Sequence, residues 1–92
     1  MIKSLVILPF DNYTGYEQLN NFVSGMHSSL IGDIGKISGL RIISKTSSDV
    51  YKNVNKSVPQ IASELDVDAV DEAKVLCLGD TICLQGIVKQ SP

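Results

Sequence analysis

The sequence predicts an α/β fold with two layers, in which a mixed sheet of four to five strands carries two helices. Three observations predict it: an apolar run of strand length near the N-terminus, a long segment with helical spacing of its apolar residues, and two apolar segments around a tight turn near the C-terminus. The expected order is β-α-β-α-β-β. Since the chain has 92 residues, we expect one domain, covering residues 1–90.

The first strand is predicted over residues 4–8, which are almost continuously apolar. Such a run is typical of a strand that is covered on both faces. Pro9 has no N–H for a sheet ladder, so we expect it to mark the end of the strand or an edge position. Residues 11–15 are rich in turn formers and predict a loop.

The first helix is predicted over residues 17–37, because apolar residues recur there at intervals of three and four. These are Leu19, Phe22, Val23, Met26, Leu30, Ile34 and Ile37. Gly39 is placed to end this helix. A second strand then follows over residues 40–44, and the long interval predicts a parallel crossover from the first strand.

The second helix begins after Ser57, whose hydroxyl lies three residues before Gln60 and predicts an N-cap with a capping box. Pro59 sits in the first turn, where its missing N–H costs little. We expect this helix to end near Asp66.

The last two strands are predicted over residues 67–78 and 81–89, with Gly79 and Asp80 in the turn between them. The two strands are apolar at consecutive positions next to the turn, in Val75-Leu76-Cys77-Leu78 and Ile82-Cys83-Leu84, so both faces of this part of the hairpin avoid charge. An exposed apolar face in a small domain indicates a covering partner. The predicted interaction surface consists of Leu76, Cys77, Ile82, Cys83 and Ile87.

The charge balance disfavours a nucleic-acid partner, since the net charge is −2 and the eight basic residues are scattered. The longest apolar run is far shorter than the roughly 20 residues of a membrane span. We therefore expect a cytoplasmic domain without membrane or direct nucleic-acid contacts. Its partners would be neighbouring domains of a parent protein or a second copy.

Few residues suggest catalysis, so we expect no enzyme, no cofactor and no metal. His27 is the only histidine, and we expect it to be a solvated residue away from the Leu30 and Ile34 stripe, without a role. Cys77 and Cys83 lack the second pair that a zinc site needs, and we expect both thiols to be free. A two-residue turn would place them on opposite faces of the hairpin, and a three-residue loop on one face.

An alternative hypothesis places a small-ligand pocket at the carboxyl ends of the first two strands, where open α/β sheets bind ligands. Its residues are Asn12, Ser44, Lys45, Thr46, Ser47 and Ser48. Two simpler interpretations compete with it. The serines and threonine could cap a turn that leads into a short helix, and Asn12 could hold its own loop.

An acidic cluster follows the second predicted helix and comprises Asp66, Asp68, Asp71 and Glu72. It has no Asp-x-Asp-x-Asp-Gly spacing, so calcium binding is disfavoured. We interpreted the cluster as a solvated negative rim.

The chain resembles the TolB amino-terminal-domain-like modules over most of its length. The matching segments are Leu5-Val6-Ile7-Leu8-Pro9-Phe10 with Asn12 and Gly15, Gly25, Ile37-Ser38-Gly39-Leu40-Arg41-Ile42-Ile43-Ser44, Thr46-Ser47-Ser48 with Tyr51, Ile61-Ala62, Glu64-Leu65, Val67-Asp68 and Gly79-Asp80. Residues 69–73 depart from the family pattern, which usually has an aromatic residue, Leu, Glu and Gly there.

The resemblance implies two helices on a mixed sheet and a role in interaction or regulation inside a larger protein. Relatives occur beside adenylate cyclase, winged-helix and tetratricopeptide-repeat domains, and the family implies no chemistry of its own. The expected function is therefore that of a non-catalytic regulatory or protein-interaction domain of a larger bacterial signalling protein or transcription regulator. The alternative is the small-ligand sensor described above.

Overall fold

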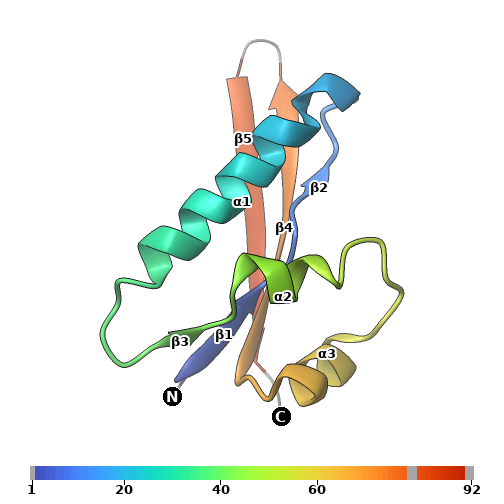
Figure 1. The fold of residues 1–92 in the computed structure, drawn as a ribbon. Coiled ribbons are helices and arrows are strands. Elements are labelled where there is room, and N and C mark those ends of the chain that lie inside the picture. Colours follow the sequence, from blue (N-terminus) through green and yellow to red (C-terminus); the bar gives the residue numbers. More distant parts are fainter. Residues whose placement is uncertain (1, 79–80, 91–92) are drawn as a thin grey trace.

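The computed structural model describes residues 2–78 and 81–90, with the backbone alone for residues 77, 78, 81 and 82. It contains a five-stranded mixed sheet and three α-helices, which confirms the predicted α/β class. Figure 1 shows helix α1 running diagonally across the sheet, with the β4–β5 hairpin extending beyond it. The predicted turn residues Gly79 and Asp80 lie outside the described residues.

Strand β1 (Ser4–Ile7) is the centre of the parallel part of the sheet. It pairs in parallel with β3 (Arg41–Ile42) on one side and with β4 (Ala69–Leu78) on the other. The predicted parallel crossover is thus confirmed, although β3 is shorter than residues 40–44. Strand β5 (Thr81–Gln90) pairs antiparallel along the whole of β4 and forms an edge of the sheet.

Strand β1 ends before Pro9, as the sequence predicted, but the predicted loop over residues 11–15 begins with a second strand instead of leaving the sheet. A second short strand, β2 (Asp11–Asn12), continues along the same edge of β4. Residues 8–10 lie opposite residues 72–73, so one extra residue forms a bulge there. Proline fits a bulge because its missing N–H is not needed in the ladder.

Helix α1 (Asn20–Ile34) follows a single 3₁₀ turn (Glu17–Leu19) and is shorter than the predicted span of residues 17–37. Gly35 caps it, so the helix ends where Gly32 and Gly35 lower helix propensity. Gly39 lies in the turn before β3 with a φ of 84°, a conformation that glycine adopts without strain. Gly39 therefore directs the chain into β3 and does not end the helix itself.

Two shorter helices begin at serine caps. The Ser44 hydroxyl accepts a hydrogen bond from the Ser47 amide at the start of α2 (Lys45–Asp49). The Ser57 hydroxyl accepts one from the Gln60 amide at the start of α3 (Val58–Leu65). Helix α3 ends at Asp66, as the sequence predicted, and this residue adopts the left-handed conformation.

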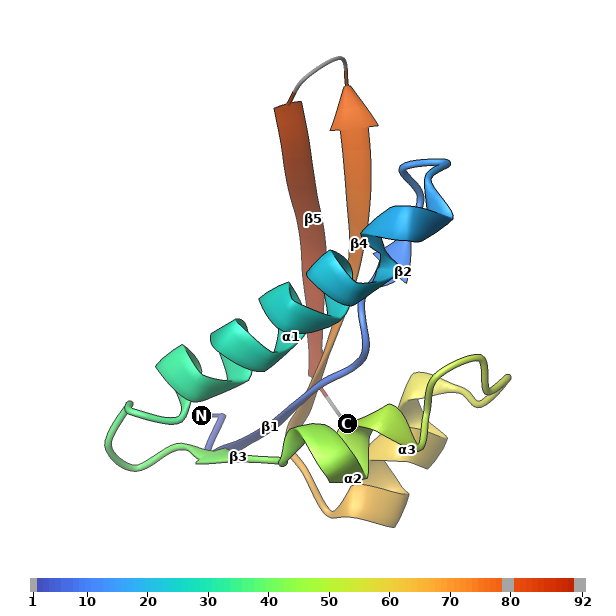
Figure 2. The ribbon, with the colours of Figure 1, turned by 45° about the horizontal axis from the view of Figure 1, so that its top comes forward.

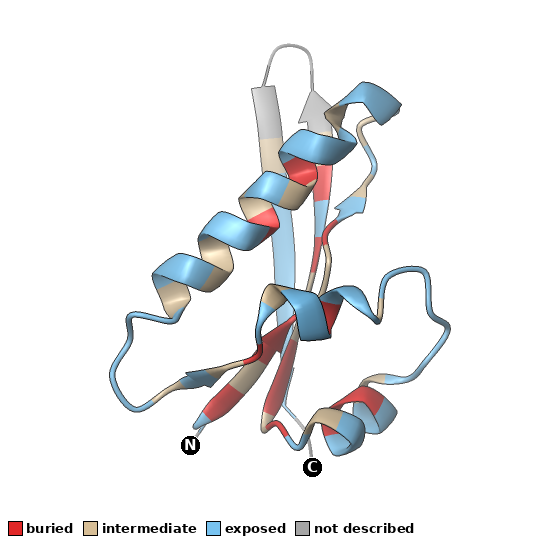
Figure 3. Cartoon of the chain, in the orientation of Figure 1, coloured by how far each residue is buried: buried red, intermediate tan, exposed pale blue. Residues whose placement is uncertain are grey.

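The core consists of two clusters on opposite faces of the sheet. One joins Ile7, Ala73 and Val75 to α1, and the other joins Val6 and Val70 to α3. The two longer helices therefore form separate layers, one on each side of the sheet, instead of one shared layer. Figure 2 shows this separation from a second direction. Figure 3 shows that burial concentrates in β1 and β4 and that much of α1 and β5 is exposed.

Candidate functional site

A polar cleft of about 500 Å³ lies where the segment after β1, helix α1 and helix α2 meet. This is the carboxyl end of β1 and β3, where the sequence placed the alternative ligand pocket. The polar residues that line it are Asp11, Asn12, Tyr13, Asn20, Ser24, His27, Lys45, Asp49, Lys52 and Asn53. Of the six residues proposed from the sequence, Asn12 and Lys45 line this cleft.

His27 lies at the inner wall of the cleft, and its side chain is only 1% exposed. Its Nε2 atom is 2.6 Å from the Ile7 carbonyl oxygen at the end of β1. A carbonyl can only accept a hydrogen bond, so Nε2 carries the proton and donates it. The prediction of a solvated histidine is therefore wrong.

The sequence carried a signal that could have placed His27 correctly. It lies four residues after the buried Val23 and three before Leu30, which packs on the same core cluster. This spacing puts all three on one face of α1. The buried face of α1 is therefore wider than the Leu30 and Ile34 stripe, and it includes His27.

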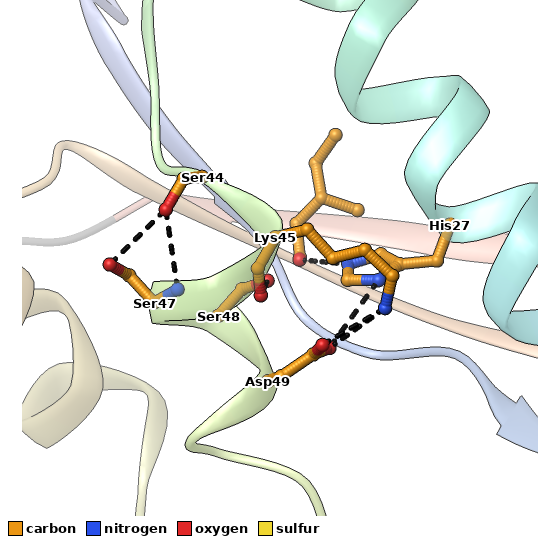
Figure 4. Close-up of polar contacts among 7 residues, drawn as sticks. His27, Ser44, Lys45, Ser47, Ser48 and Asp49 are labelled. Atoms are coloured by element: carbon orange, nitrogen blue, oxygen red, sulfur yellow. Dashed lines mark hydrogen bonds and ion pairs between the residues drawn. The ribbon is translucent and has the colours of Figure 1, made fainter.

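The other ring nitrogen of His27 has no partner among the described residues. Nδ1 is buried without a hydrogen bond, and the Asp49 carboxylate lies 3.9 Å away. Asp49 is itself bound by the Lys45 ammonium at 2.9 and 3.2 Å. Figure 4 shows His27 of α1 directed at this α2 ion pair. The ring also packs edge-on against Phe10, with centroids 5.3 Å apart.

Asn12 holds the loop and lines the cleft at once, so its two interpretations are compatible. Its carbonyl oxygen accepts hydrogen bonds from the Thr14 amide at 3.0 Å and hydroxyl at 2.6 Å. Its amide nitrogen donates to the Tyr16 carbonyl at 3.0 Å and to the Asn20 side chain at 2.8 Å. These bonds use its hydrogen-bonding capacity within the loop.

The predicted Ser and Thr ligands mostly build helix α2. Ser44 caps the helix, Ser47 also contacts the Ser44 hydroxyl at 3.2 Å, and the buried Ser48 hydroxyl donates to the Lys45 carbonyl at 3.0 Å. Thr46 is exposed and does not line the cleft. The interpretation as a capped turn that leads into a short helix is confirmed.

The predicted interaction surface is described in part. Leu76 and Cys83 lie opposite each other in the β4–β5 register and are half-buried, and Ile87 is 60% exposed. The side chains of Cys77 and Ile82 lie outside the described residues. Since Cys83 pairs with Leu76, the register matches the two-residue-turn alternative, and Cys83 is a free thiol.

Residues of the acidic cluster make specific hydrogen bonds and ion pairs, so the cluster is not simply a solvated rim. The Asp68 carboxylate accepts hydrogen bonds from the Lys3 and Ser4 amides at 2.8 and 3.2 Å, and these bonds lower the pKa of Asp68. Glu72 forms an ion pair with Lys89 of β5 at 2.9 Å. Asp71 is half-buried on the α1 face of β4, and burial, followed by the nearby Glu72 charge, raises its pKa.

We predict that Asp71→Asn raises the melting temperature at pH 7. A raised pKa means that the folded protein binds this proton more tightly than the unfolded chain, so ionisation of Asp71 costs stability as pH rises. The amide removes that cost. Below about pH 3 the carboxyl is protonated in both states, and the gain should vanish. Thermal unfolding across this pH range, with the exposed Asp33→Asn as control, measures it; a gain independent of pH would contradict the explanation.

Within the described part of the chain, no group of three or more His, Cys, Asp or Glu side chains is arranged to hold a metal ion. Nor does any described helix have the length and apolar character needed to cross a membrane.

Comparison with solved structures defines the fold class. The chain resembles the crystal structure of lipoprotein GNA1162 from Neisseria meningitidis with a TM-score of 0.64, over 96% of this chain and 83% of that one. The two sequences are 14% identical, so this likeness concerns the fold alone.

Comparison with curated proteins points to one particular sequence. The chain is 36% identical over 72 residues to a protein of Rhizobium meliloti (strain 1021) named "Putative adenylate cyclase 3". The match covers 78% of this chain but 12% of the relative, so the chain corresponds to a small part of that protein. No family model matches the chain.

Proposed function

We propose that this chain is a non-catalytic regulatory or protein-interaction domain of a larger bacterial signalling protein or transcription regulator. The match to a small part of a protein named as a cyclase supports a modular role. The mixed sheet with two longer helices fits the TolB amino-terminal-domain-like modules that the sequence resembles. Residues 1–90 would then be one module of the parent protein.

The observation that carries the proposal is the exposed edge strand β5. It is ten residues long and, among the described strands, pairs with β4 alone. Leu84, Ile87 and Val88 are 47, 60 and 55% exposed along it. A long edge with exposed apolar residues is a ready template for pairing with another strand.

The usual protections of an exposed edge are missing from β5. Proteins guard such edges with charged side chains, prolines or bulges. Strand β5 contains no proline, and its sole charged residue is Lys89. That ammonium is bound to Glu72 at 2.9 Å across the hairpin, so its charge is partly neutralised by the neighbouring strand.

The partner we propose for β5 is the same strand of a second copy. Two antiparallel strands related by a two-fold axis perpendicular to the sheet pair residues of the same face. An axis that passes between the two Gly86 residues places Leu84 of each copy opposite Val88 of the other copy. Two apolar cross-strand pairs would then close on the α1 side of the joined sheet.

Sedimentation analysis over a range of concentrations tests this association. We expect the chain to dimerise. Val88→Lys should weaken dimerisation at least tenfold, because the added ammonium would be desolvated in the dimer interface. Val50→Lys is the matched control, since Val50 is 69% exposed outside β5. A wild-type chain that stays monomeric at all concentrations, or equal losses in both variants, would contradict pairing with a second copy.

A second candidate function, a small-ligand sensor, is favoured by the cleft at the carboxyl ends of β1 and β3. The cleft holds a buried histidine nitrogen without a hydrogen bond among the described residues. A ligand that binds only the folded chain would raise its melting temperature. The cytoplasmic location and the lack of catalysis stay predictions from the sequence.

A further inference from the structure

Two hydrogen-bond acceptors face each other at the inner end of the cleft. A His27 ring whose single proton sits on Nε2, where it is donated to Ile7, presents a lone pair at Nδ1. This atom lies 3.9 Å from a carboxylate oxygen of Asp49. An amino or ammonium nitrogen with two or more N–H groups can donate to two acceptors this close together, each at ordinary hydrogen-bond length.

An ammonium already occupies one of these acceptors. Lys45 binds both carboxylate oxygens of Asp49, at 2.9 and 3.2 Å, from one turn earlier on α2. The Lys45 and Asp49 side chains are 30 and 43% exposed. An ion pair of this exposure contributes little to stability, so another ammonium can replace that of Lys45 on Asp49.

The charged residues around the cleft match a ligand that carries both signs. Asp11 and Asp49 supply two negative charges, and Lys45 and Lys52 supply two positive charges. The Lys52 ammonium makes no ion pair with the described residues. The balanced lining disfavours a strongly anionic ligand, and side-chain amides from Asn20 and Asn53 add neutral hydrogen-bonding groups.

We propose that the cleft binds a free amino acid or a similarly small zwitterion. The ligand ammonium donates hydrogen bonds to His27 Nδ1 and to the Asp49 carboxylate, and it displaces the Lys45 ammonium from Asp49. The ligand carboxylate then binds the ammonium groups of Lys45 and Lys52. The cleft volume of about 500 Å³ suits such a ligand, since small-molecule pockets span roughly 300–1,000 Å³. This inference rests on the ligand-sensor function, and it names the ligand class.

Thermal-shift screening of the whole chain tests the ligand class. The probes are the twenty standard L-amino acids, methylamine, acetate, inorganic phosphate and adenosine monophosphate. We expect at least one amino acid to raise the melting temperature and to bind at least tenfold more tightly than methylamine or acetate in calorimetry. Each of these two probes carries only one of the two charges.

Two variants then test the proposed contacts. Asp49→Asn should weaken binding of the best amino acid at least tenfold, because the amide lacks the charge that holds the ligand ammonium. Lys52→Gln should weaken it about fivefold or more. Asp33→Asn and Lys36→Gln are matched controls, since these side chains, at the end of α1 and just after it, are 75 and 81% exposed and should leave binding unchanged.

The outcomes separate this inference from the sensor function itself. Stabilisation by phosphate or adenosine monophosphate, without any by amino acids, would overturn the zwitterion and keep the sensor. Stabilisation by no probe would count against both. Equal weakening by Asp49→Asn and Asp33→Asn would overturn the proposed contacts, because the effect would then be one of net charge.

Discussion

His27→Ala should lower the free energy of unfolding by about 3 kcal/mol. The substitution removes the hydrogen bond to the Ile7 carbonyl, worth about 1 kcal/mol, and the packing of a fully buried ring against Phe10. The loss should be large for a domain of this size, since small domains have a stability of only about 5–10 kcal/mol. Urea unfolding followed by circular dichroism measures it.

Two further variants separate the contributions of His27. His27→Phe keeps an aromatic ring but not the donor, so we expect it to lose less stability than alanine, about 1–2 kcal/mol. Ser29→Ala, at an exposed position on the same helix, should change stability by less than about 0.5 kcal/mol. If His27→Ala were as mild as Ser29→Ala, the buried position of the ring would be refuted.

Ile61→Ala should cost about 3 kcal/mol on the other face of the sheet. Ile61 is 4% exposed and joins α3 to Val6 and Val70. Helix α3 has eight residues, too few to be stable without tertiary contacts. We therefore expect faster amide hydrogen exchange in α3 together with the loss of global stability.

The exposed Ser63→Ala is the control on the same helix and should leave both measurements close to wild type. If Ile61→Ala lowered global stability but left exchange in α3 as slow as elsewhere, α3 would not depend on this contact. A loss below about 1 kcal/mol would mean that the α3 cluster contributes little to the core.

The sequence predicted those features that depend on local chemistry. Apolar runs in residues 4–8 and in the C-terminal hairpin located the main strands, because strand length and β-branched content are visible in the chain itself. Ser44 and Ser57 marked helix starts through hydroxyls that reach an amide three residues on. Asp66 ended α3 where expected.

Features that depend on contacts distant in sequence were missed. Strand β2 exists because β4 offers a free edge beside Asp11 and Asn12, and nothing within residues 9–12 predicts that pairing. The Asp68 carboxylate accepts hydrogen bonds from backbone amides at the start of β1, more than sixty residues earlier in the chain. Local patterns cannot encode such pairings, since each depends on where the partner segment ends up.

By itself, then, the sequence determined the α/β class and the parallel crossover, and it offered a pocket at the carboxyl ends of β1 and β3 as one of two interpretations. Only the tertiary structure decided which residues make that cleft. His27 belongs to it because β1 ends in a carbonyl that needs a donor at that depth, and α2 brings Lys45 and Asp49 over the ring. The periodicity of one helix shows which face is apolar. It does not show which polar group on that helix will find a hydrogen-bond partner on another element.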